Sequence, residues 1–309
     1  MTATRPFPGR VGVIGLGRMG GRMAARLLDP SAGFAVTVCD VAADRAQALA
    51  SQGARMTATP RAVAEACDVV LTAVPDGAAV FDVLQGPDGL LAARRHAGKA
   101  VLVEMSTIGV EESARVAALC FAAGLRYVRC PVLGTLESAA EGQLTALVSG
   151  AGPDVEAVQP VLARLCREQR YLGPAEEARL VKLIVNGLLG TSIAALAEGL
   201  ALGQRAGINR DALLDLVAHS AVASPAVVGT AQRLRQGTFE PRLSATLLTK
   251  DLRLLNEAAA DAGALAPMAE AAHQRYAATV EHGWGDLDFS AVLLLYETLN
   301  EQCAHRSIS

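Results

Sequence analysis

The pattern of apolar residues along the chain changes once, at Gly173, and this change limits the folds that the sequence can adopt. Before Gly173, short apolar runs rich in β-branched residues alternate with amphipathic stretches, which is typical of parallel strands covered by helices on both faces. After it, the strand pattern disappears and helical segments follow one another, separated by glycine and proline. The sequence therefore predicts an α/β chain with a doubly wound N-terminal sheet, residues 1–174, and an all-helical C-terminal domain, residues 175–309.

We expect strands over six runs of the first domain: 11–14, 35–40, 68–74, 100–105, 125–129 and 144–149. The second domain is expected to contain helices over residues 176–206, 210–219, 226–236, 243–262, 267–282 and 290–305. The most apolar part of the helix at 176–206, residues 183–203, contains Asn186, Glu198 and several glycines, which favours a buried helix over a membrane span. It is too long and apolar for one small domain to cover, so we expect it to pack against a second subunit as well.

Composition excludes several other classes of protein. Of the 309 residues, 51% are apolar and 19% charged, which is incompatible with disorder over most of the chain. A net charge of −3, with 4% aromatic residues and no basic run, argues against nucleic-acid binding. The histidines show no metal-ligand spacing, so no metal site is expected. The absence of a signal-peptide pattern and the six scattered cysteines favour a cytoplasmic protein.

The most specific local motif is the pattern G-x-G-x-x-G formed by Gly15, Gly17 and Gly20, which follows an apolar strand and opens a helix. Gly15 allows a tight turn, Gly17 lets the backbone approach a pyrophosphate, and Gly20 allows the helix to pack closely on the strand. The phosphates would lie at the helix N-terminus, where N–H groups favour an anion. The motif predicts a Rossmann domain that binds a dinucleotide through Gly15, Leu16, Gly17, Arg18, Met19 and Gly20.

Asp40, at the end of the second apolar strand, bears on which dinucleotide is bound. A carboxylate there accepts hydrogen bonds from ribose hydroxyls and repels a 2′-phosphate, so the sequence predicts NAD, although Arg18 and Arg45 leave NADP open. A carboxylate that caps the next helix is the structural alternative. Val74 and Pro75 end another strand at the carboxyl edge of the sheet, where they either line the cofactor crevice or form a plain turn.

Lys182 and Asn186 stand four residues apart in the long helical segment and therefore share one helix face. Only three of the 28 basic residues are lysines, so a lysine among apolar neighbours invites a functional explanation. Its charge is expected to be either paired or destabilised by desolvation, and the second case suits a proton donor near neutral pH. A lysine that extends to the surface is an equal alternative on this evidence.

Five segments, in order along the chain, resemble the β-hydroxyacid dehydrogenase family, which includes 3-hydroxyisobutyrate dehydrogenase, tartronate semialdehyde reductase and glyoxylate/succinic semialdehyde reductases. The resemblance extends over residues 12–299. The segments are the glycine loop 15–20; Glu104-Met-Ser-Thr107; Pro131-Val-Leu-Gly-Thr135 with Gly142-Gln-Leu144; Gly173 followed by Lys182 and Asn186; and Lys250-Asp251-Leu252 with Gly283-Trp-Gly-Asp-Leu-Asp-Phe-Ser290.

The resemblance implies hydride transfer between a nicotinamide cofactor and a small 3-hydroxy acid or its semialdehyde or 3-oxo acid. It implies Lys182 as the general acid/base and Asn186 as a residue that orients the substrate. The other site residues that it implies are Ser106 and Thr107 for the substrate carboxylate, Gly134 and Thr135 on the next loop, and Thr107 and Lys250, with Asp251 beside it, for the cofactor.

Five positions depart from the family pattern. Arg129 and Leu133 stand where the family commonly has Asp and Ser, and Leu133 is expected to make the substrate pocket less polar or differently shaped. Glu176 and Ala178 replace glycines, and Glu176 is expected to complement the dipole of the long helix or to meet an amino group of the substrate. Glu104 replaces an Asp without an evident consequence.

Two other functions remain as alternatives. One is a catalytically silent NAD(H)-binding or scaffold protein, against which the intact Lys182, Asn186, Ser106 and Thr107 argue. The other is an imine reductase-like enzyme of the same architecture, which usually has another residue in place of Lys182. The sequence is thus expected to encode a cytoplasmic NAD-dependent 3-hydroxyacid dehydrogenase that acts on a small carboxylate as a homodimer or homotetramer, without nucleic-acid or membrane partners.

Overall fold

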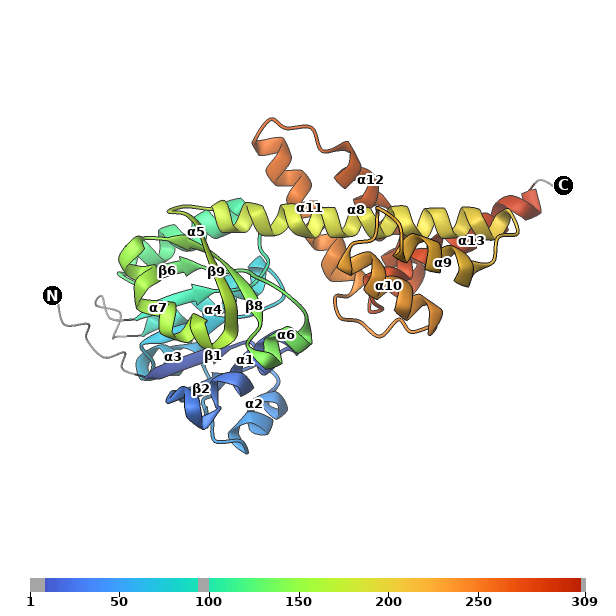
Figure 1. The fold of residues 1–309 in the computed structure, drawn as a ribbon. Coiled ribbons are helices and arrows are strands. Elements are labelled where there is room, and N and C mark those ends of the chain that lie inside the picture. The colour runs from blue at the N-terminus through green and yellow to red at the C-terminus, as the bar shows by residue number, and fades with distance from the viewer. Residues whose placement is uncertain (1–8, 94–99, 307–309) are drawn as a thin grey trace. The chain divides into compact units, whose positions relative to one another are not determined.

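The computed structural model describes residues 9–93 and 100–306, with the side chains of these residues up to 302. The chain divides into two compact units, Met1–Lys182 and Leu183–Ser309, both drawn in Figure 1. The division lies inside helix α8 (Glu177–Arg205), whereas the sequence places it just before this helix, between residues 174 and 175.

Within the described residues, nine strands of the first unit form one sheet in the order β3-β2-β1-β4-β5-β6-β8-β7, with β9 paired to β8. Neighbouring strands from β3 to β6 are parallel, as predicted, because the chain returns across the sheet after each strand. These strands are β1 (Arg10–Ile14), β2 (Ala35–Cys39), β3 (Arg55–Met56), β4 (Val69–Thr72), β5 (Val101–Glu104) and β6 (Arg126–Arg129).

The last strands depart from the parallel arrangement that the sequence suggested. β8 (Leu144–Gly150) is antiparallel to β6, and β7 (Val132–Leu133) continues the same ladder beyond Pro131. The chain keeps its direction from β6 into β7, and the short helix α6 (Leu136–Glu141) then reverses it. β9 (Cys166–Gly173) runs parallel to β8 at its other side.

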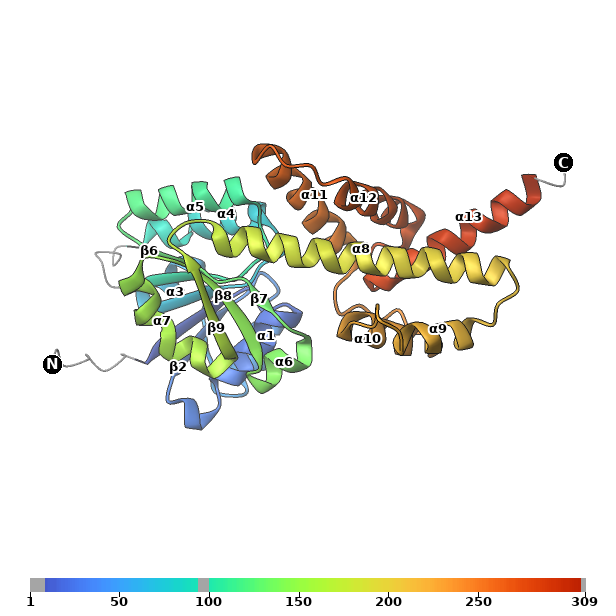
Figure 2. The same ribbon diagram turned by 45° about the horizontal axis from the view of Figure 1, so that its top comes forward.

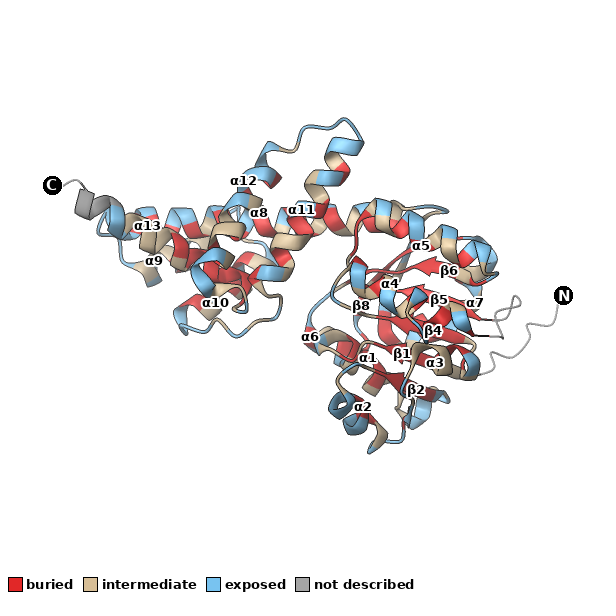
Figure 3. Ribbon diagram, turned by 180° about the vertical axis from the view of Figure 1, so that it is seen from behind, coloured by how far each residue is buried: buried red, intermediate tan, exposed pale blue. Residues whose placement is uncertain are grey.

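Two apolar clusters show that the sheet is covered on both faces, as predicted for a doubly wound domain. Val13, Leu71 and Val103 point into one cluster, whereas the neighbouring strand residues Val70 and Leu102 point into the other. The first cluster is completed by helices α1 (Arg18–Leu27), α2 (Ala43–Ala50) and α7 (Gly152–Leu165). The second is completed by α3 (Pro60–Ala66), α4 (Gly77–Gln85) and α5 (Val110–Ala122). Figure 2 shows these helical layers, and Figure 3 shows the buried strands between them.

The second unit is helical, as predicted. Its core contains Ile193, Ala197 and Leu200 of α8, packed with apolar residues of the later helices. By length and composition alone, α8 could cross a membrane. In the structure, the apolar residues of α8 that belong to this core account for part of that composition. The later helices are α9 (Arg210–Ala218), α10 (Pro225–Arg235), α11 (Ala245–Asp261), α12 (Pro267–Thr279) and α13 (Val292–Arg306).

Candidate active site

The glycine loop connects β1 to α1 at the point where the strand order reverses, because β1 lies between β2 and β4. Gly15 has a φ of +87°, and a Cβ atom there would lie 2.4 Å from the Ala73 carbonyl oxygen. A Cβ atom on Gly20 would lie 2.0 Å from the Gly15 carbonyl oxygen, whereas one on Gly17 would meet no atom within 4 Å. Gly15 and Gly20 therefore allow the backbone to pack closely, whereas Gly17 leaves open space at the N-terminus of α1. This arrangement fits the pyrophosphate of a dinucleotide.

The carboxylate of Asp40 holds the glycine loop in place. Its Oδ2 accepts a hydrogen bond from the Leu16 N–H at 2.5 Å, and its Oδ1 accepts one from the Ala42 N–H at 2.7 Å. The half-exposed guanidinium of Arg45 lies 3.6 Å from Oδ1. Asp40 thus lies beside the loop with a cation next to it, so features that favour NAD and NADP occur together.

Ser106 connects the ends of two neighbouring strands. Its hydroxyl oxygen accepts a hydrogen bond from the N–H of Val74, which follows β4, at 2.8 Å. Its own N–H donates to Glu104 Oε1 at 2.8 Å, and its carbonyl oxygen accepts a bond from Arg179 at 2.6 Å. The hydroxyl hydrogen is therefore the donor that Ser106 can offer a ligand. Thr107 follows it, half-buried, in the turn before α5.

Lys182 lies against β7, the short strand that follows β6. Its ammonium Nζ donates a hydrogen bond to the Val132 carbonyl oxygen at 2.9 Å. Gly134, two residues further on, has a φ of +139°, and Thr135 caps α6 by accepting the Ser138 N–H at 3.2 Å. The first unit therefore brings Lys182 to the segment that leads into the Gly134–Thr135 loop.

Three residues predicted for the site form a cluster in the second unit. The amide Nδ2 of Asn186 on α8 donates to Asp251 Oδ2 on α11 at 2.6 Å, and Lys250 Nζ lies 3.2 Å from Asp251 Oδ1. Asn186 and Asp251 are buried. One turn of α8 lies close to α11 here, because a Cβ atom on Gly187 would lie 2.2 Å from Leu255 Cδ2.

Comparison with known proteins identifies the family. Residues 10–173 match the family model described as the NAD binding domain of 6-phosphogluconate dehydrogenase. Residues 177–296 match the model described as NAD-binding of NADP-dependent 3-hydroxyisobutyrate dehydrogenase. The chain is 32% identical to 2-(hydroxymethyl)glutarate dehydrogenase of Eubacterium barkeri over 94% of this chain and 95% of that protein. The chain belongs to the 3-hydroxyisobutyrate dehydrogenase family.

Solved structures agree with this assignment. The crystal structure of 3-hydroxyisobutyrate dehydrogenase from Salmonella typhimurium has a TM-score of 0.84 and 29% identity, over 93% of this chain and 99% of that one. Psf3, solved in complex with NADP+ and 2-OPP, has a TM-score of 0.82 and 26% identity, over 92% of this chain and 99% of that one. As a member of this β-hydroxyacid dehydrogenase family, the chain is an NAD(P)-dependent oxidoreductase.

Two departures from the 3-hydroxyisobutyrate dehydrogenase family pattern are partners in the structure. The Arg129 Nε donates to Glu176 Oε1 at 2.8 Å, and its guanidinium lies 4.8 Å from the centre of the Tyr127 ring. Arg129 is only 8% exposed, so this ion pair is mostly removed from water. The sequence suggested the helix dipole or a substrate amine as the partner of Glu176, but the structure shows Arg129 in that position.

Arg179 is the main residue of this region that the sequence analysis missed. It is buried on the first turn of α8, beside Glu104, the third departure from the family pattern. An arginine in the apolar run before Lys182 was a usable signal, because a buried guanidinium requires a carboxylate partner. Its partner is 75 residues away in sequence, so the sequence alone did not identify it.

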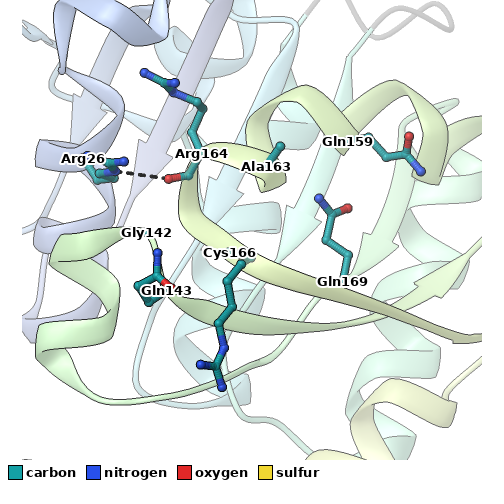
Figure 4. A pocket seen from close by; sticks show the side chains of 9 residues that line it. Arg26, Gly142, Gln143, Gln159, Ala163, Arg164, Cys166 and Gln169 are labelled. Carbon is teal, nitrogen blue, oxygen red and sulfur yellow. Dashed lines mark hydrogen bonds between the residues drawn. The ribbon is translucent and has the colours of Figure 1, made fainter.

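A surface hollow of about 700 Å³ in the first unit lies apart from these residues. Arg26 Nε donates to the Arg164 carbonyl oxygen at 3.3 Å at one side of it (Figure 4). None of its lining residues is among those predicted for the site. They are Arg26, Gly142, Gln143, Gln159, Ala163, Arg164, Cys166, Arg167 and Gln169.

Proposed function

We propose that the chain interconverts a small 3-hydroxy acid and the matching semialdehyde or 3-oxo acid, with Lys182 as the general acid/base. The observation that carries this proposal is the bond from Lys182 Nζ to the Val132 carbonyl oxygen, which holds an ammonium group beside the Gly134–Thr135 loop. The names of the relatives, a 2-(hydroxymethyl)glutarate dehydrogenase and a 3-hydroxyisobutyrate dehydrogenase, support the same class of substrate.

The ammonium group of Lys182 is a suitable proton donor for this role. It has three N–H donors, and one of them bonds to the Val132 carbonyl oxygen. In reduction, Lys182 would donate a proton to the substrate oxygen as negative charge develops there, and in oxidation it would accept the hydroxyl proton. A nicotinamide cofactor held at the glycine loop would supply or accept the hydride. Ser106, through its hydroxyl hydrogen, and Thr107 are proposed to bind the substrate carboxylate.

The proposed cofactor is NAD, held by the glycine loop, with Asp40 disfavouring a 2′-phosphate. NADP remains the second choice because Arg45 lies beside Asp40 and because Psf3 was solved with NADP+. Asn186 and Lys250, held by Asp251, are proposed to assist in orienting the substrate and in binding the cofactor.

We further propose that the protein is a homo-oligomer. Ile184 and Leu188, one turn apart on α8, are 42% and 65% exposed within the single chain. Large apolar side chains in such a row are commonly covered by another subunit. Light scattering after size-exclusion chromatography should therefore give a mass of at least two chains.

The reaction is tested by absorbance at the reduced-nicotinamide band, with a panel of small 3-hydroxy acids plus NAD or NADP and of semialdehydes plus the reduced cofactors. Lys182→Ala should lower turnover by on the order of 10²–10⁴-fold, the usual contribution of positioned proton transfer. Lys182→Arg keeps the positive charge but does not release a proton near neutral pH, so it should fail similarly. Calorimetric binding of NADH should persist in both variants.

Ser192→Ala is the matched control, because Ser192 lies exposed on the same helix and its hydroxyl donates to the Leu188 carbonyl oxygen in the preceding turn. It should turn over like the unmodified protein. Full activity of Lys182→Ala would overturn the assignment of Lys182. Intact NADH binding with no turnover of any panel member would favour the silent NAD(H)-binding alternative.

A further inference from the structure

The side chain of Arg179 joins α8 to three other elements of the first unit. It is 1% exposed, and its guanidinium has five N–H donors. The Nε donates to Ser113 Oγ of α5 at 3.1 Å, and Nη1 donates to the Ser106 carbonyl oxygen at 2.6 Å. The Nη2 donates to Tyr127 OH of β6 at 3.3 Å, to the Glu104 carbonyl oxygen at 3.1 Å and to the Glu104 carboxylate. One helical side chain therefore fixes the end of β5 from several directions.

Glu104 completes the connection between Arg179 and Ser106. While Oε2 pairs with Arg179, Oε1 accepts the Ser106 N–H at 2.8 Å and the Thr72 hydroxyl at 3.4 Å. The N–H of Ser106 is thus held by Glu104 and its carbonyl oxygen by Arg179. Both peptide groups flanking Ser106 are fixed by this one ion pair.

Arg179 keeps its charge despite being buried. Burial acts to lower the pKa of Arg179, but the carboxylate of Glu104, together with Tyr127 and Glu176, outweighs burial and raises this pKa above its usual value. A permanently charged, planar donor is suited to a fixed geometry because its hydrogen bonds do not depend on pH.

The next turn of α8 carries Lys182. Arg179 and Lys182 are three residues apart, which places their side chains about one turn apart on a helix. Lys182 Nζ is held by the Val132 carbonyl oxygen, so two neighbouring side chains of α8 bind the segment after β5 and the segment after β6.

We propose that Arg179, with Glu104, is a positioning residue that sets the location of Ser106 relative to Lys182. The inference rests on the proposed function, in which Ser106 binds the substrate carboxylate and Lys182 moves the proton. A displacement of about 1 Å between such groups costs on the order of 10²-fold in rate. The Arg179–Glu104 pair would therefore act on turnover without touching the substrate.

Arg179→Lys tests the geometry, because lysine keeps the charge but cannot bond Ser106, Glu104 and Ser113 from one planar group. It should lower kcat by on the order of 10²-fold, whereas NADH should still bind, because the glycine loop is not altered. Arg129→Lys is the matched control. Arg129 pairs with Glu176 and, among the described residues, bonds neither Ser106 nor Glu104, so the kcat of Arg129→Lys should stay near that of the unmodified protein.

A second set of variants separates position from stability. Arg179→Gln leaves Glu104 buried without a counter-charge and should lower Tm, whereas the double variant with Glu104→Gln removes that lone charge and should recover Tm. The kcat of the double variant should stay low, because neither amide replaces the guanidinium. Recovery of kcat together with Tm, or an equal loss of kcat in Arg129→Lys, would overturn the positioning role.

A spectroscopic readout keeps this test independent of turnover. The chain has three lysines, so ¹³Cε labelling of lysine gives few NMR signals, and Lys182→Arg identifies that of Lys182. The Lys182 signal should shift in the Arg179→Gln/Glu104→Gln variant and remain in place in Arg129→Gln. If the Lys182 signal does not move in the double variant, the positioning role is overturned, whether or not any substrate of the panel is turned over. If the unmodified protein turns over no substrate, only the proposed reaction is overturned.

Discussion

The carboxyl ends of β1 and β5 lie at the same edge of one parallel sheet, yet they are built differently. After β1, glycines bring backbone against backbone, and Gly17 leaves space at a helix N-terminus. After β5, the backbone of Ser106 is enclosed by Glu104 and Arg179, whose side chains exclude water. The end of β1 leaves space that a ligand can fill, whereas the polar backbone groups at the end of β5 are bonded by side chains of the protein.

This difference shows two ways of preparing a site. A large ligand with many contacts, such as a dinucleotide, can be bound by a loop whose main requirement is the absence of side chains. A small substrate offers few contacts, so the groups that meet it must be held in place beforehand by their neighbours. We therefore expect substitutions at the two strand ends to fail in different ways.

The largest effect is expected within the glycine loop itself. Gly20→Ala places a Cβ atom 2.0 Å from the backbone oxygen of Gly15, which cannot move aside, so the free energy of unfolding should fall by about 3 kcal/mol or more. Gly17→Ala meets no atom and its φ of −62° suits alanine, so its stability should change by less than about 0.5 kcal/mol.

Urea unfolding and fluorescence titration with NADH check this pair. Gly17→Ala should fold normally but bind NADH at least about tenfold more weakly, because its methyl group occupies the approach of the pyrophosphate. NADH binding of Gly17→Ala equal to that of the unmodified protein would mean that the end of β1 is not built around a ligand, and the contrast between the two strand ends would disappear.

A smaller effect is expected for the choice between NADH and NADPH. The unmodified protein should bind NADH more tightly than NADPH. Asp40→Asn should reduce the ratio of the two dissociation constants by about tenfold, because it removes one charge interaction near the protein surface. The asparagine oxygen can still accept the Leu16 N–H and hold the glycine loop, whereas the bond from the Ala42 N–H is lost because the amide nitrogen cannot accept it. Arg45→Ala, which removes the neighbouring cation, should widen the difference. Tighter binding of NADPH by the unmodified protein would contradict the role given to Asp40.

The smallest effect concerns the network after β5. Burial raises the pKa of Tyr127, so this phenol stabilises the folded protein below about pH 10, and that stability is lost as the pH rises above its unfolded-state value. Tyr127→Phe should cost about 1 kcal/mol at neutral pH, because its bonds to Ser113 and Arg179 are lost. It should also make the free energy of unfolding fall less steeply between about pH 9 and 11.

Urea unfolding at a series of pH values measures this, with Tyr171→Phe as the control at an exposed tyrosine. An alkaline fall as steep in Tyr127→Phe as in the unmodified protein would show that ionisation of Tyr127 does not limit stability there.

The parts of the molecule that sequence predicted are those that depend on local patterns. The parallel strands, the glycine loop and the second domain of helices follow from periodicity and turn residues within short windows. β3 and β7 were missed because they have two residues each, and β9 because its mostly polar residues, few of them buried, lack an apolar alternation. The reversal at β8 depends on pairing with β6, which no short window contains.

The residues of the candidate site also differ in how far the sequence predicts them. The positions of Gly15, Gly17, Lys182 and the 131–135 loop came from motifs and from the family resemblance. The pairing of Arg129 with Glu176, 47 residues apart, did not, because two charges in a sequence do not indicate which partner each will meet. Three departures that seemed unrelated in the sequence thus belong to two ion pairs, one with Arg129 and the other with Arg179.

The buried pair of Glu104 and Arg179 also constrains how the protein can evolve. A lineage that first replaces one of them with an uncharged residue must pass through a chain with a lone buried charge, which is less stable by about 3–5 kcal/mol. That is a large part of the stability of an ordinary domain. Such intermediates are readily lost by selection, so the two residues should be inherited together. Among related sequences, the pair should appear or vanish as one character and so mark a branch of the family.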